Sequence, residues 1–497
     1  MEMQIAELYR TSQIRELEAI AEKEYNISEQ MLMERAGAAL FRNLQAHWPT
    51  AEDIVILAGV GNNSGDSLIL ARLAHEAGLN VVVLHLGPLD SFKGAAKLAC
   101  DAAVASEINF QPYNDEFALG HADLIVDGIL GTGLERNVEG LFLTAIEHVN
   151  DEDVPVLAID VPSGLDSDTG SVRGAAVIAD LTVTFIGAKQ GLFTGAGVEH
   201  AGEVILDDLD IPEEAFEEVV DNGYLLDMED LAGCLGLRHR DANKGDYGHV
   251  LVVGGNLGMA GAARMAGEAA ARAGAGLVSI ATRPQHIAAI AGPRPELMCH
   301  GIDHAEQLEP LLERATVIVI GPGLGKDEWA QSLLKRCLES DLPKIVDADA
   351  LNLLAANGSF QVKGEWVMTP HPGEAARLLE CKVETIQNNR FAAADELHDK
   401  FSAVVVLKGS GTLIVGAEDV LAICPSGNPG MASGGMGDIL SGFIAGVVAQ
   451  EVPLQIAAQC GVAVHSYAGD LAAEKLGERG LLATDLLPFA RALINTL

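Results

Sequence analysis

Short runs of purely apolar residues recur along the first half of the chain. They cover residues 54–58, 81–84, 124–126 and 156–159, and each is followed by a polar or glycine-bearing turn. Uninterrupted apolar runs of this length are typical of parallel strands that are buried on both faces. Residues 11–47 and 67–77 carry apolar positions at helical spacing. The alternation of strands and helices predicts an α/β fold built on a parallel sheet.

The second half of the chain repeats this pattern. Its apolar runs cover residues 249–253, 277–282, 317–320, 345–346, 366–368 and 404–407, and small residues predict a helix over 260–273. The fold class predicted for the whole chain is therefore α/β with two doubly wound domains. Residues 439–468 are apolar and glycine-rich, but Glu451 and Pro453 interrupt them. This segment is expected to form two buried helices rather than a membrane span.

An acidic stretch led by a proline separates the two halves. Residues 212–218 read Pro-Glu-Glu-Ala-Phe-Glu-Glu, and Asp221, Asn222 and Gly223 follow shortly after. A length of 497 residues suggests two or three domains. We therefore expect one domain over residues 1–222 and another over residues 223–497.

The charge of the chain excludes some classes of partner. A formal net charge of −39 argues against binding to nucleic acids or anionic membranes. The N-terminal residues lack a basic cluster followed by an apolar core, which predicts a cytoplasmic protein. The seven cysteines are far apart and show no paired spacing of the kind that binds metals, so buried free thiols are expected.

Residues 430–438 form the most distinctive motif of the second half. They read Gly-Met-Ala-Ser-Gly-Gly-Met-Gly-Asp, and an apolar run at helical spacing follows. A glycine turn that opens a buried helix offers free N–H groups and a positive dipole end to an anion such as a phosphate. Asp438 would repel that anion, so we interpret it as a base that takes a proton from a hydroxyl group. The alternative is that Asp438 only caps the helix.

Polar side chains also follow the predicted strands of the first half. Asp127 and Asp160 stand at two strand ends, and residues 61–66 form the polar loop Gly-Asn-Asn-Ser-Gly-Asp. These carboxylates are expected to converge on one crevice with Asn63 and Asp66, because open α/β sheets bind ligands at this edge. A single aspartate of this kind would be read as a loop cap. The oxygen atoms of Asn63, Asp127 and Ser163 would suit a hard cation better than zinc.

Residues 52–212 resemble the NAD(P)H-hydrate epimerase domain. The resemblance lies in residues 61–66, in 127–134 (Asp-Gly-Ile-Leu-Gly-Thr-Gly-Leu), in 160–165 (Asp-Val-Pro-Ser-Gly-Leu) and in 189–191 (Lys-Gln-Gly). It implies a Rossmann-like domain that interconverts the R and S forms of hydrated NADH and NADPH (NADHX and NADPHX). It further implies potassium binding by Asn63, Asp127 and Ser163. Residues implied to bind the hydrate are Asn62, Asn63, Ser64, Gly65, Asp66, Gly131, Thr132, Gly133, Leu134, Glu135, Arg136, Asn137 and Asp160, with Asp160 also a catalytic candidate.

Two serines depart from the pattern of that family. Ser64 and Ser67 stand where the family usually has glycine, and a serine is expected to add a side chain next to the ligand. This departure motivates an alternative in which the first half is a binding module without turnover.

Residues 235–497 resemble the ADP-dependent NAD(P)H-hydrate dehydratase of the ribokinase-like superfamily. The resemblance lies in residues 244–255, 321–325, 369–374 and 434–438, and in their order along the chain. It implies ADP as phosphoryl donor, with AMP and phosphate as products, and dehydration of the S form. It places Lys408, Gly409, Ser410, Gly411, Thr412 and Gly437 around the nucleotide, and Ala262, Gly323, His371 and Asp438 around the hydrate.

The resemblance of both halves implies a repair enzyme for damaged nicotinamide cofactors. Its substrates would be NADHX, NADPHX and ADP, and its cofactors K⁺ in the first half and Mg²⁺ in the second, where Glu374 is the candidate to position magnesium. A homo-oligomer is expected. The alternative for the second half is a kinase acting on a small vitamin-like alcohol, against which His371, Lys244 and the fusion itself argue.

Overall fold

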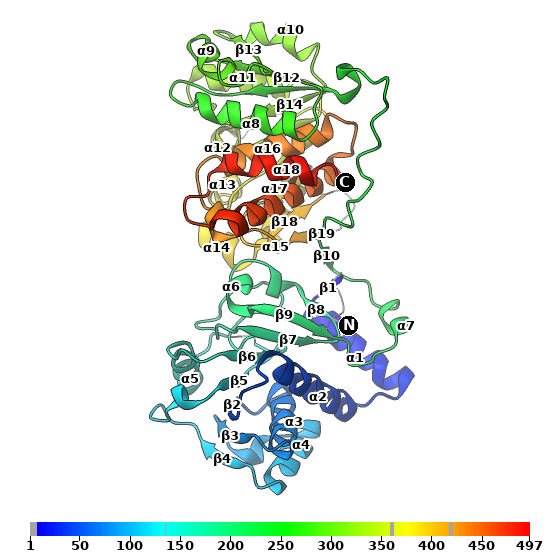
Figure 1. Cartoon of the computed structure of the whole chain (residues 1–497), viewed down its shortest axis with the longest axis vertical. Helices are drawn as coiled ribbons and strands as arrows, with labels where there is room; N and C mark the ends of the chain where they lie inside the picture. The colour runs from blue at the N-terminus through cyan, green and yellow to red at the C-terminus, as the bar shows by residue number, and fades with distance from the viewer. Residues whose placement is uncertain (1–6, 135, 358–361, 417–420) are drawn as a thin grey trace. The chain divides into compact units, whose positions relative to one another are not determined.

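The computed structural model describes residues 7–134, 136–357, 362–416 and 421–497. The chain divides into two compact units, Met1–Tyr224 and Leu225–Leu497 (Figure 1). Each unit is described separately below.

The first unit contains a seven-stranded parallel sheet with the order β4-β3-β2-β5-β6-β7-β9. The chain moves outward from β2 to β4 and then returns to β5 on the other side of β2. This reversal opens a crevice at the carboxyl ends of β2 and β5, where open α/β sheets bind ligands. The strands are β2 (Asp53–Ala58), β3 (Asn80–His85), β4 (Asn109–Pro112), β5 (Leu124–Gly128), β6 (Val156–Ile159), β7 (Leu181–Phe185) and β9 (Glu203–Asp207).

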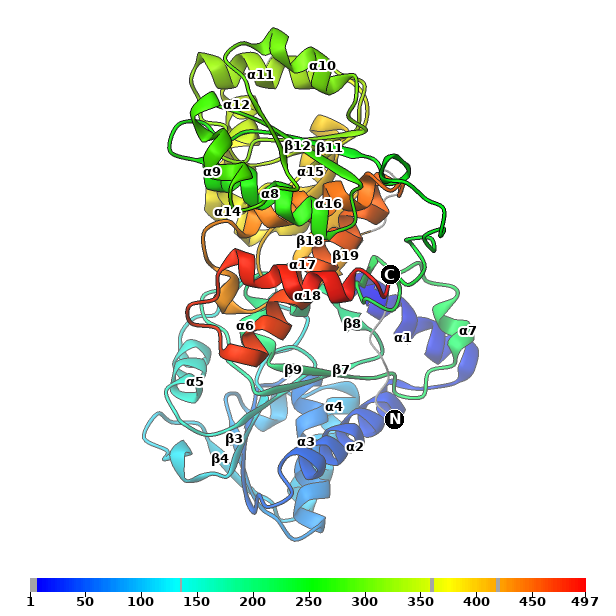
Figure 2. The ribbon, with the colours of Figure 1, turned by 45° about the horizontal axis from the view of Figure 1, so that its top comes forward.

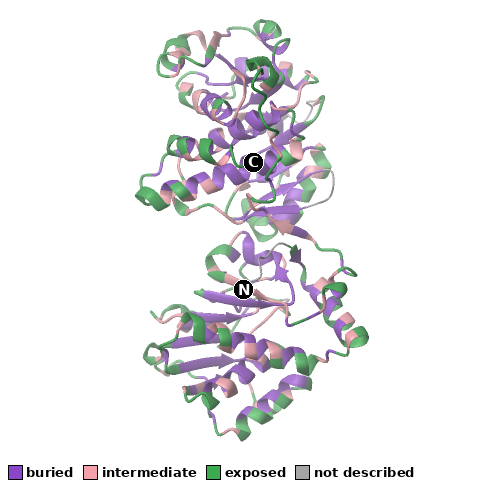
Figure 3. Ribbon diagram, turned by 45° about the vertical axis from the view of Figure 1, so that its right-hand side comes forward, coloured by how far each residue is buried: buried purple, intermediate pink, exposed green. Residues whose placement is uncertain are grey.

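Helices cover both faces of this sheet because its strands are apolar on both sides. Ile54 and Ile56 of β2 pack in the cluster that includes helices α1 to α4, whereas Val55 and Leu57 pack in the cluster that includes α5. The central strands are accordingly buried, whereas the edge strands β4 and β9 are partly exposed (Figure 3). The helices are α1 (Thr11–Tyr25), α2 (Glu29–His47), α3 (Asn62–Glu76), α4 (Gly94–Ala105), α5 (Leu141–Asn150), α6 (Gly197–Ala201) and α7 (Glu213–Phe216). The short strands β1 (Glu7–Tyr9), β8 (Ala188–Lys189) and β10 (Gly223–Leu225) pair around β1.

The second unit contains strands in the order β13-β12-β11-β14-β15-β16-β17-β18-β19. The pairs from β13 to β17 are parallel, whereas β18 and β19 pair antiparallel. The antiparallel edge was not predicted, because the apolar runs alone do not distinguish a tight hairpin from a crossover connection. The strands are β11 (His249–Val253), β12 (Leu277–Thr282), β13 (Met298–Gly301), β14 (Val317–Ile320), β15 (Lys344–Val346), β16 (Trp366–Met368), β17 (Val404–Leu407), β18 (Thr412–Val415) and β19 (Leu421–Cys424).

Helices α8 (Ala260–Arg272), α16 (Met436–Val448) and α17 (Leu454–Leu476) pack on successive strands of this sheet. Helix α18 (Leu486–Leu493) lies beside α17 (Figure 2). The predicted pair of buried helices on either side of Pro453 is thus confirmed. The remaining helices are α9 (Ile287–Ala291), α10 (Glu309–Leu312), α11 (Glu328–Leu338), α12 (Ala348–Asn357), α13 (Pro372–Leu378), α14 (Val383–Asn388) and α15 (Arg390–Phe401).

Helix α3 begins earlier than the sequence predicted. The expected helix started at residue 67, but α3 starts at Asn62, with Gly61 as its N-cap in extended conformation. The prediction took the polar residues as a loop, whereas they form the first turn of the helix. The amide groups of this first turn consequently belong to a helix N-terminus directly after β2.

The seven cysteines carry free thiols, as expected, but only some of them are fully buried. Cys100, Cys337, Cys424 and Cys460 are buried, whereas Cys234, Cys299 and Cys381 are half-buried. In the part of the chain that the structure describes, no helix has the length and apolar character needed to cross a membrane.

Glycines allow α8 and α16 to approach closely. A Cβ atom at Gly442 would lie 2.2 Å from the Ala266 carbonyl oxygen, and one at Gly446 would lie 2.6 Å from that of Ala270. The two helices therefore pack with their backbones almost in contact. This packing fixes the position of α16, whose first turn carries Asp438.

We predict that Gly442→Ala destabilises the second unit. Alanine favours helix formation by about 1 kcal/mol, but overpacking against a backbone oxygen costs about 1–3 kcal/mol and should prevail. The measurement is thermal or urea unfolding. The matched control is Gly261→Ala in α8, where no atom lies within 4 Å of the added Cβ and a small gain in stability is expected. Equal stability changes in the two variants would contradict the packing argument.

Candidate active sites

A cavity of about 1020 Å³ lies at the carboxyl edge of the first sheet. Its walls come from the first helices of the chain, from the start of α3 and from the segments that follow β5 and β6. Predicted site residues that line it are Asn62, Asn63, Asp66, Gly131, Thr132, Gly133, Leu134, Arg136 and Asp160. The structure therefore brings most of the predicted hydrate-binding residues to one cavity.

Asp160 is held in the cavity wall by a buried lysine. The backbone of Asp160 has a φ of +64°, which is uncommon for a residue other than glycine and aims its side chain sharply away from β6. Its Oδ1 accepts hydrogen bonds from Lys189 Nζ, from Thr184 Oγ1 at 3.1 Å and from the Phe185 amide at 3.2 Å. Lys189 is 1% exposed and also donates to the Phe185 carbonyl at 2.7 Å. A fixed carboxylate thus faces the cavity with its charge compensated.

Other carboxyl groups line the same cavity. Burial raises the pKa of Asp66 well above its usual value, and the negative charges of Asp160 and Glu18 raise it further. Burial also raises the pKa of Glu18, although the positive charge of Lys189 opposes this change. The cavity therefore holds Asp66, whose neutral form burial favours, beside the ion-paired carboxylate of Asp160. Such a pair can donate and accept protons on one ligand.

Asp127 does not line the cavity, contrary to the expectation that both strand-end aspartates meet in one crevice. Its side chain is fully buried within the end of β5, where it accepts bonds from the Ser163 amide at 2.7 Å and the Ser163 hydroxyl at 2.5 Å. Burial raises the pKa of Asp127 to about 6. The last residues of a strand alternate in direction, which turns this side chain inward.

Asn63 connects the cavity wall to this buried cluster. Its Nδ2 donates to the Leu130 carbonyl at 2.8 Å, and the Leu130 amide donates to Ser163 Oγ at 2.8 Å. Asn63 Oδ1 is buried and has no hydrogen-bond partner among the described residues. A buried acceptor without a partner is costly unless a cation or water occupies the space beside it. The amide, carboxylate and hydroxyl oxygens of Asn63, Asp127 and Ser163 therefore fit a cation with oxygen ligands.

The two serines that replace glycines do not point into the cavity. Ser64 and Ser67 are both fully buried; Ser64 Oγ donates to the Gly128 carbonyl at 2.8 Å and Ser67 Oγ to the Ser64 carbonyl at 2.7 Å. The expectation that these serines add side chains next to the ligand is wrong, because both hydroxyl groups bond to the neighbouring backbone. Gly65 is buried against Met33, Asn137 is exposed outside the cavity wall, and Glu135 lies outside the described residues.

The second site is centred on the start of α16. Lys408 Nζ donates to Asp347 Oδ1 at 2.8 Å, and Ser441 Oγ donates to Asp347 Oδ2 at 2.8 Å. A Cβ atom at Gly437 would lie 3.1 Å from Lys408 Nζ, so a glycine there lets the ammonium group approach the helix N-terminus. Burial favours neutral Lys408, but the charges of Asp347 and Glu374 outweigh it and raise its pKa. The ammonium group therefore stays charged beside the amide groups of α16.

Asp438 is the third residue of α16 and is not its cap. The N-cap is Gly435, with a φ of +96°, and no side chain caps this helix. The capping alternative for Asp438 is therefore wrong. Burial raises the pKa of Asp438 to about 7, with a further increase from the negative charge of Asp347 that Lys408 partly offsets. A carboxyl group that titrates near neutral pH is suited to proton transfer.

His371 and Glu374 approach the same lysine from the start of α13. The His371 amide donates to Glu374 Oε2 at 2.9 Å, and His371 Nδ1 accepts a bond from the Gly373 amide at 2.9 Å. Burial raises the pKa of Glu374 to about 7. The pKa of His371 is lowered, first by burial and then by the positive charge of Lys408, so its half-exposed ring is neutral at pH 7. His371 can therefore donate a hydrogen bond to a ligand from Nε2.

Two glycine-bearing loops form the other side of this site. The Asn256 amide donates to the Gly323 carbonyl at 2.7 Å, and a Cβ atom at Gly323 would lie 3.1 Å from that of Ala262. The predicted residues Ala262 and Gly323 are thus neighbours. Gly323 has a φ of +56° and Met259 crowds it, so a larger residue would displace the loop.

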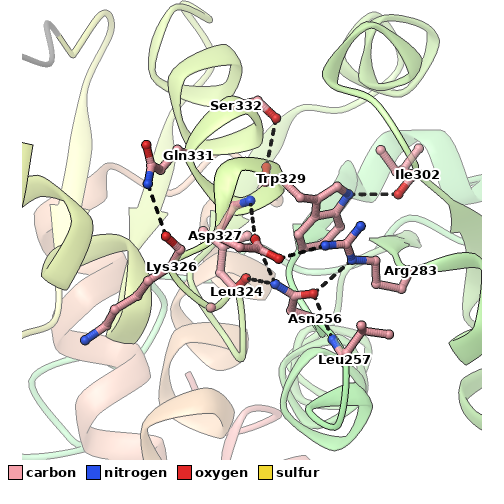
Figure 4. A network of polar contacts seen from close by, with 12 residues as sticks. Asn256, Leu257, Arg283, Ile302, Leu324, Lys326, Asp327, Trp329, Gln331 and Ser332 are labelled. Carbon is pink, nitrogen blue, oxygen red and sulfur yellow. Dashed lines mark hydrogen bonds and ion pairs between the residues drawn. The ribbon is translucent and has the colours of Figure 1, made fainter.

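A polar network anchors these loops (Figure 4). Asn256 Nδ2 donates to the Leu324 carbonyl at 3.0 Å and to Asp327 Oδ1 at 3.1 Å, while Arg283 Nε donates to Asn256 Oδ1 at 2.9 Å. Arg283 also pairs with Asp327 at 2.9 Å and stacks over the Trp329 ring at 4.2 Å. This network holds Leu324, the residue after Gly323, in place.

Residues 408–412 form the turn between β17 and β18. Gly409 and Ser410 are exposed, Gly411 is buried, and Thr412 Oγ1 donates to the Gly409 carbonyl at 3.0 Å. The first residue of this turn, Lys408, reaches the start of α16, so the structure brings Lys408 and Gly437 together as predicted.

The sequence did not identify several residues that build these sites. Glu18 and Arg15 line the first cavity from α1, and Ser441 fixes Asp347 in the second site. Glu18 and Arg15 lie on the polar face of an amphipathic helix, where sequence alone cannot distinguish a cavity wall from solvent. From the sequence, Lys189 could be either a surface charge or a cation that offsets ligand charge, and its burial with Asp160 was the missing signal.

Both units are thus open α/β sheets. The first has a cavity at its carboxyl edge, and the second carries a cluster of charged side chains at the start of a helix whose N-cap is a glycine. Residues 250–490 match the protein family described as NAD(P)H-hydrate dehydratase, and residues 29–191 match the YjeF-related protein N-terminus. The chain belongs to the family of bifunctional NAD(P)H-hydrate repair enzymes. It is an epimerase and a nucleotide-dependent dehydratase acting on NAD(P)H hydrates.

Similar proteins match over most of the chain. The Bifunctional NAD(P)H-hydrate repair enzyme Nnr of Coxiella burnetii is 52% identical over 98% of this chain and 99% of that protein. The enzyme of the same name from Escherichia coli is 41% identical over 93% of this chain and 89% of its own length. A ribokinase-like superfamily protein from Enterococcus faecalis matches 55% of this chain and 95% of its own, with 32% identity and a TM-score of 0.51. The alternatives of a vitamin kinase and of a first half without turnover are therefore wrong.

We predict that Lys189→Met destabilises the first unit by about 3 kcal/mol, because it leaves the Asp160 carboxylate without its cation. Thermal unfolding measures the loss. The double variant Lys189→Met, Asp160→Asn should recover part of it, since the uncompensated charge is gone. Lys23→Met, which removes a lysine that is 80% exposed, is the matched control and should have no effect. If the double variant is no more stable than the single one, the charge argument fails.

Proposed function

We propose that the two reactions are divided between the two halves, with epimerisation in residues 1–222 and dehydration in residues 223–497. In the first half, the hydrate would bind in the cavity that Asn62, Asp66 and Asp160 line. Epimerisation requires the hydroxyl group to leave one face of the reduced ring and water to return to the other. Asp66, whose pKa is raised by burial, and Asp160, which is ion-paired with Lys189, would supply the acid and the base.

The first half would hold potassium behind the cavity wall through Asn63, Asp127 and Ser163. The buried Oδ1 of Asn63, which lacks a partner among the described residues, supports this proposal. When bound, a monovalent cation would supply positive charge that offsets the buried carboxylate. The chain's own contribution is to hold the loops after β5 and β6 together through the Ser163 hydroxyl.

In the second half, the dehydration would proceed by phosphorylation of the hydrate hydroxyl group. Hydroxide is a poor leaving group from the ring and phosphate is a good one. The β-phosphoryl group of ADP would be transferred to the hydroxyl oxygen, AMP would leave, and the ring nitrogen would expel phosphate to restore NADH or NADPH. Asp438 would take the hydroxyl proton, and the amide groups at the start of α16 with Lys408 would stabilise the charge on the transferring group.

The observation that carries this proposal is the position of Asp438. It is a carboxyl group with a pKa of about 7 in the first turn of a helix that has no side-chain cap. The nucleotide would contact Lys408, Gly409, Ser410, Gly411, Thr412 and Gly437, and the hydrate would contact Ala262, Gly323 and His371.

Magnesium would be positioned near Glu374, which is buried beside Lys408 and whose carboxyl oxygens suit a hard cation. When bound, it would supply charge neutralisation to the nucleotide phosphates. The preference for the S form, a cytoplasmic location and a homo-oligomeric state stay predictions.

We predict that Asp438→Asn abolishes dehydration and leaves epimerisation unchanged. In the unaltered enzyme, dehydration should increase with pH, by about tenfold from pH 6 to a plateau above pH 8, because only the ionised Asp438 accepts a proton. Reduced-nicotinamide absorbance with ADP and hydrated NADH measures the rate. Glu374→Gln, which removes the other carboxyl group that titrates near pH 7, should keep this pH dependence. If the dehydration rate of Glu374→Gln does not change with pH, the group that must be ionised is Glu374 and not Asp438.

We predict that potassium raises the thermal stability of the first half. The increase should be measured against choline at equal ionic strength, because choline is too large for the cluster of Asn63, Asp127 and Ser163. Asn63→Leu should remove the potassium-dependent increase, whereas Asn43→Leu in α2, outside this cluster, should retain it. An equal increase with choline would contradict the cation site.

A further inference from the structure

A buried arginine lies behind the turn of residues 408–412. Arg390 is the first residue of α15, and its side chain is 1% exposed. Its Nη2 donates to the Leu407 carbonyl at 3.1 Å, to the Lys408 carbonyl at 3.4 Å and to the Gly411 carbonyl at 3.4 Å, and its Nη1 also donates to the Lys408 carbonyl at 3.4 Å. One guanidinium group therefore holds three carbonyl groups of the turn.

These bonds fix both peptide groups that flank Lys408. The Leu407 carbonyl is held by Arg390, and the Lys408 amide of the same peptide donates to the Pro370 carbonyl at 2.9 Å. The next peptide is held through the Lys408 carbonyl. With both peptide planes fixed, the direction of the Lys408 Cα–Cβ bond is fixed as well. Lys408 Nζ is thereby aimed at Asp347 and the start of α16.

The same bonds orient an amide group of the turn. In a trans peptide the carbonyl and the following N–H point in opposite directions, and no cis peptide occurs in the described residues. Because the Lys408 carbonyl points toward Arg390, the Gly409 amide points away from it, toward the exposed side of the turn. An outward amide beside an ammonium group suits an anion such as a nucleotide phosphate.

The guanidinium group of Arg390 leaves no space for a side chain at residue 409, which is a glycine. Its φ is +144°, and a Cβ atom there would lie 2.7 Å from Arg390 Nη1. The turn and the guanidinium group are therefore in direct contact, with no room for a side chain. Burial lowers the pKa of Arg390 only to about 10, so the group remains a cation at neutral pH.

We propose that Arg390 is a positioning residue for dehydration, which sets Lys408 and the Gly409 amide for the nucleotide phosphates without touching the nucleotide itself. This inference rests on the proposed nucleotide site at residues 408–412. A lysine at position 390 would keep the charge but could not bond the three carbonyl groups in the same planar arrangement.

The test uses the full-length enzyme and measures kcat and KM for ADP in dehydration, with epimerisation measured on the same samples. Arg390→Met should raise KM for ADP at least tenfold, and Arg390→Lys should recover only part of this loss. Arg336→Met, which removes an arginine from an ion pair with Glu309, is the matched control and should change KM less than twofold.

The outcomes separate the two proposals. If Lys408→Met leaves KM for ADP unchanged, the nucleotide site itself is misassigned, and the role of Arg390 fails with it. If Lys408→Met raises KM for ADP but Arg390→Met and Arg390→Lys lower only the thermal stability, Arg390 is structural and the inference is overturned. If Arg390→Met does not fold, Arg390→Lys decides between these results.

Discussion

Each of the two sites depends on a lysine that is paired with an aspartate at the carboxyl end of a parallel strand. In the first unit the pair is Lys189 and Asp160, and in the second it is Lys408 and Asp347. A buried charge without a partner is costly, so the lysine and the aspartate of each pair stabilise each other in their charged forms. The chain as a whole carries a net charge of −39, and its ligands are anions. In each site the lysine compensates the charge of the aspartate, so that the carboxylate adds less to the repulsion of an anionic ligand.

In the proposed sites, helix N-termini would supply further attraction for these ligands. Helix α3 begins directly after β2 and α16 begins after a glycine turn, so both present free amide groups at the sites. The position of α16 in turn depends on its close packing against α8. Gly442 and Gly446 have no side chains, so the two helix backbones approach each other directly. Helix packing that begins one turn beyond Asp438 thus determines where the amide groups and Asp438 lie.

The carboxyl groups of the two sites are tuned by burial rather than by residue type. Asp347 and Asp438 lie beside the same lysine, yet burial and like charge raise the pKa of Asp438 to about 7, whereas the contact with Lys408 outweighs burial and lowers the pKa of Asp347. One aspartate therefore stays ionised and holds the lysine, and the other is free to exchange a proton near neutral pH. In the first cavity, burial raises the pKa of Asp66, and Asp160 bonds to Lys189.

The sequence by itself determined the two α/β units, most strand positions, the paired helices around Pro453 and the order of the ligand loops. These features follow from apolar runs and glycine turns, which act over a few residues. Tertiary structure alone decided that Asp127 turns inward, that Ser64 and Ser67 bond to backbone, that α1 lines the first cavity, and that Arg390 lies behind residues 408–412. Each of these depends on contacts between residues that are distant in the chain. A local sequence pattern does not specify which distant residue a side chain will contact.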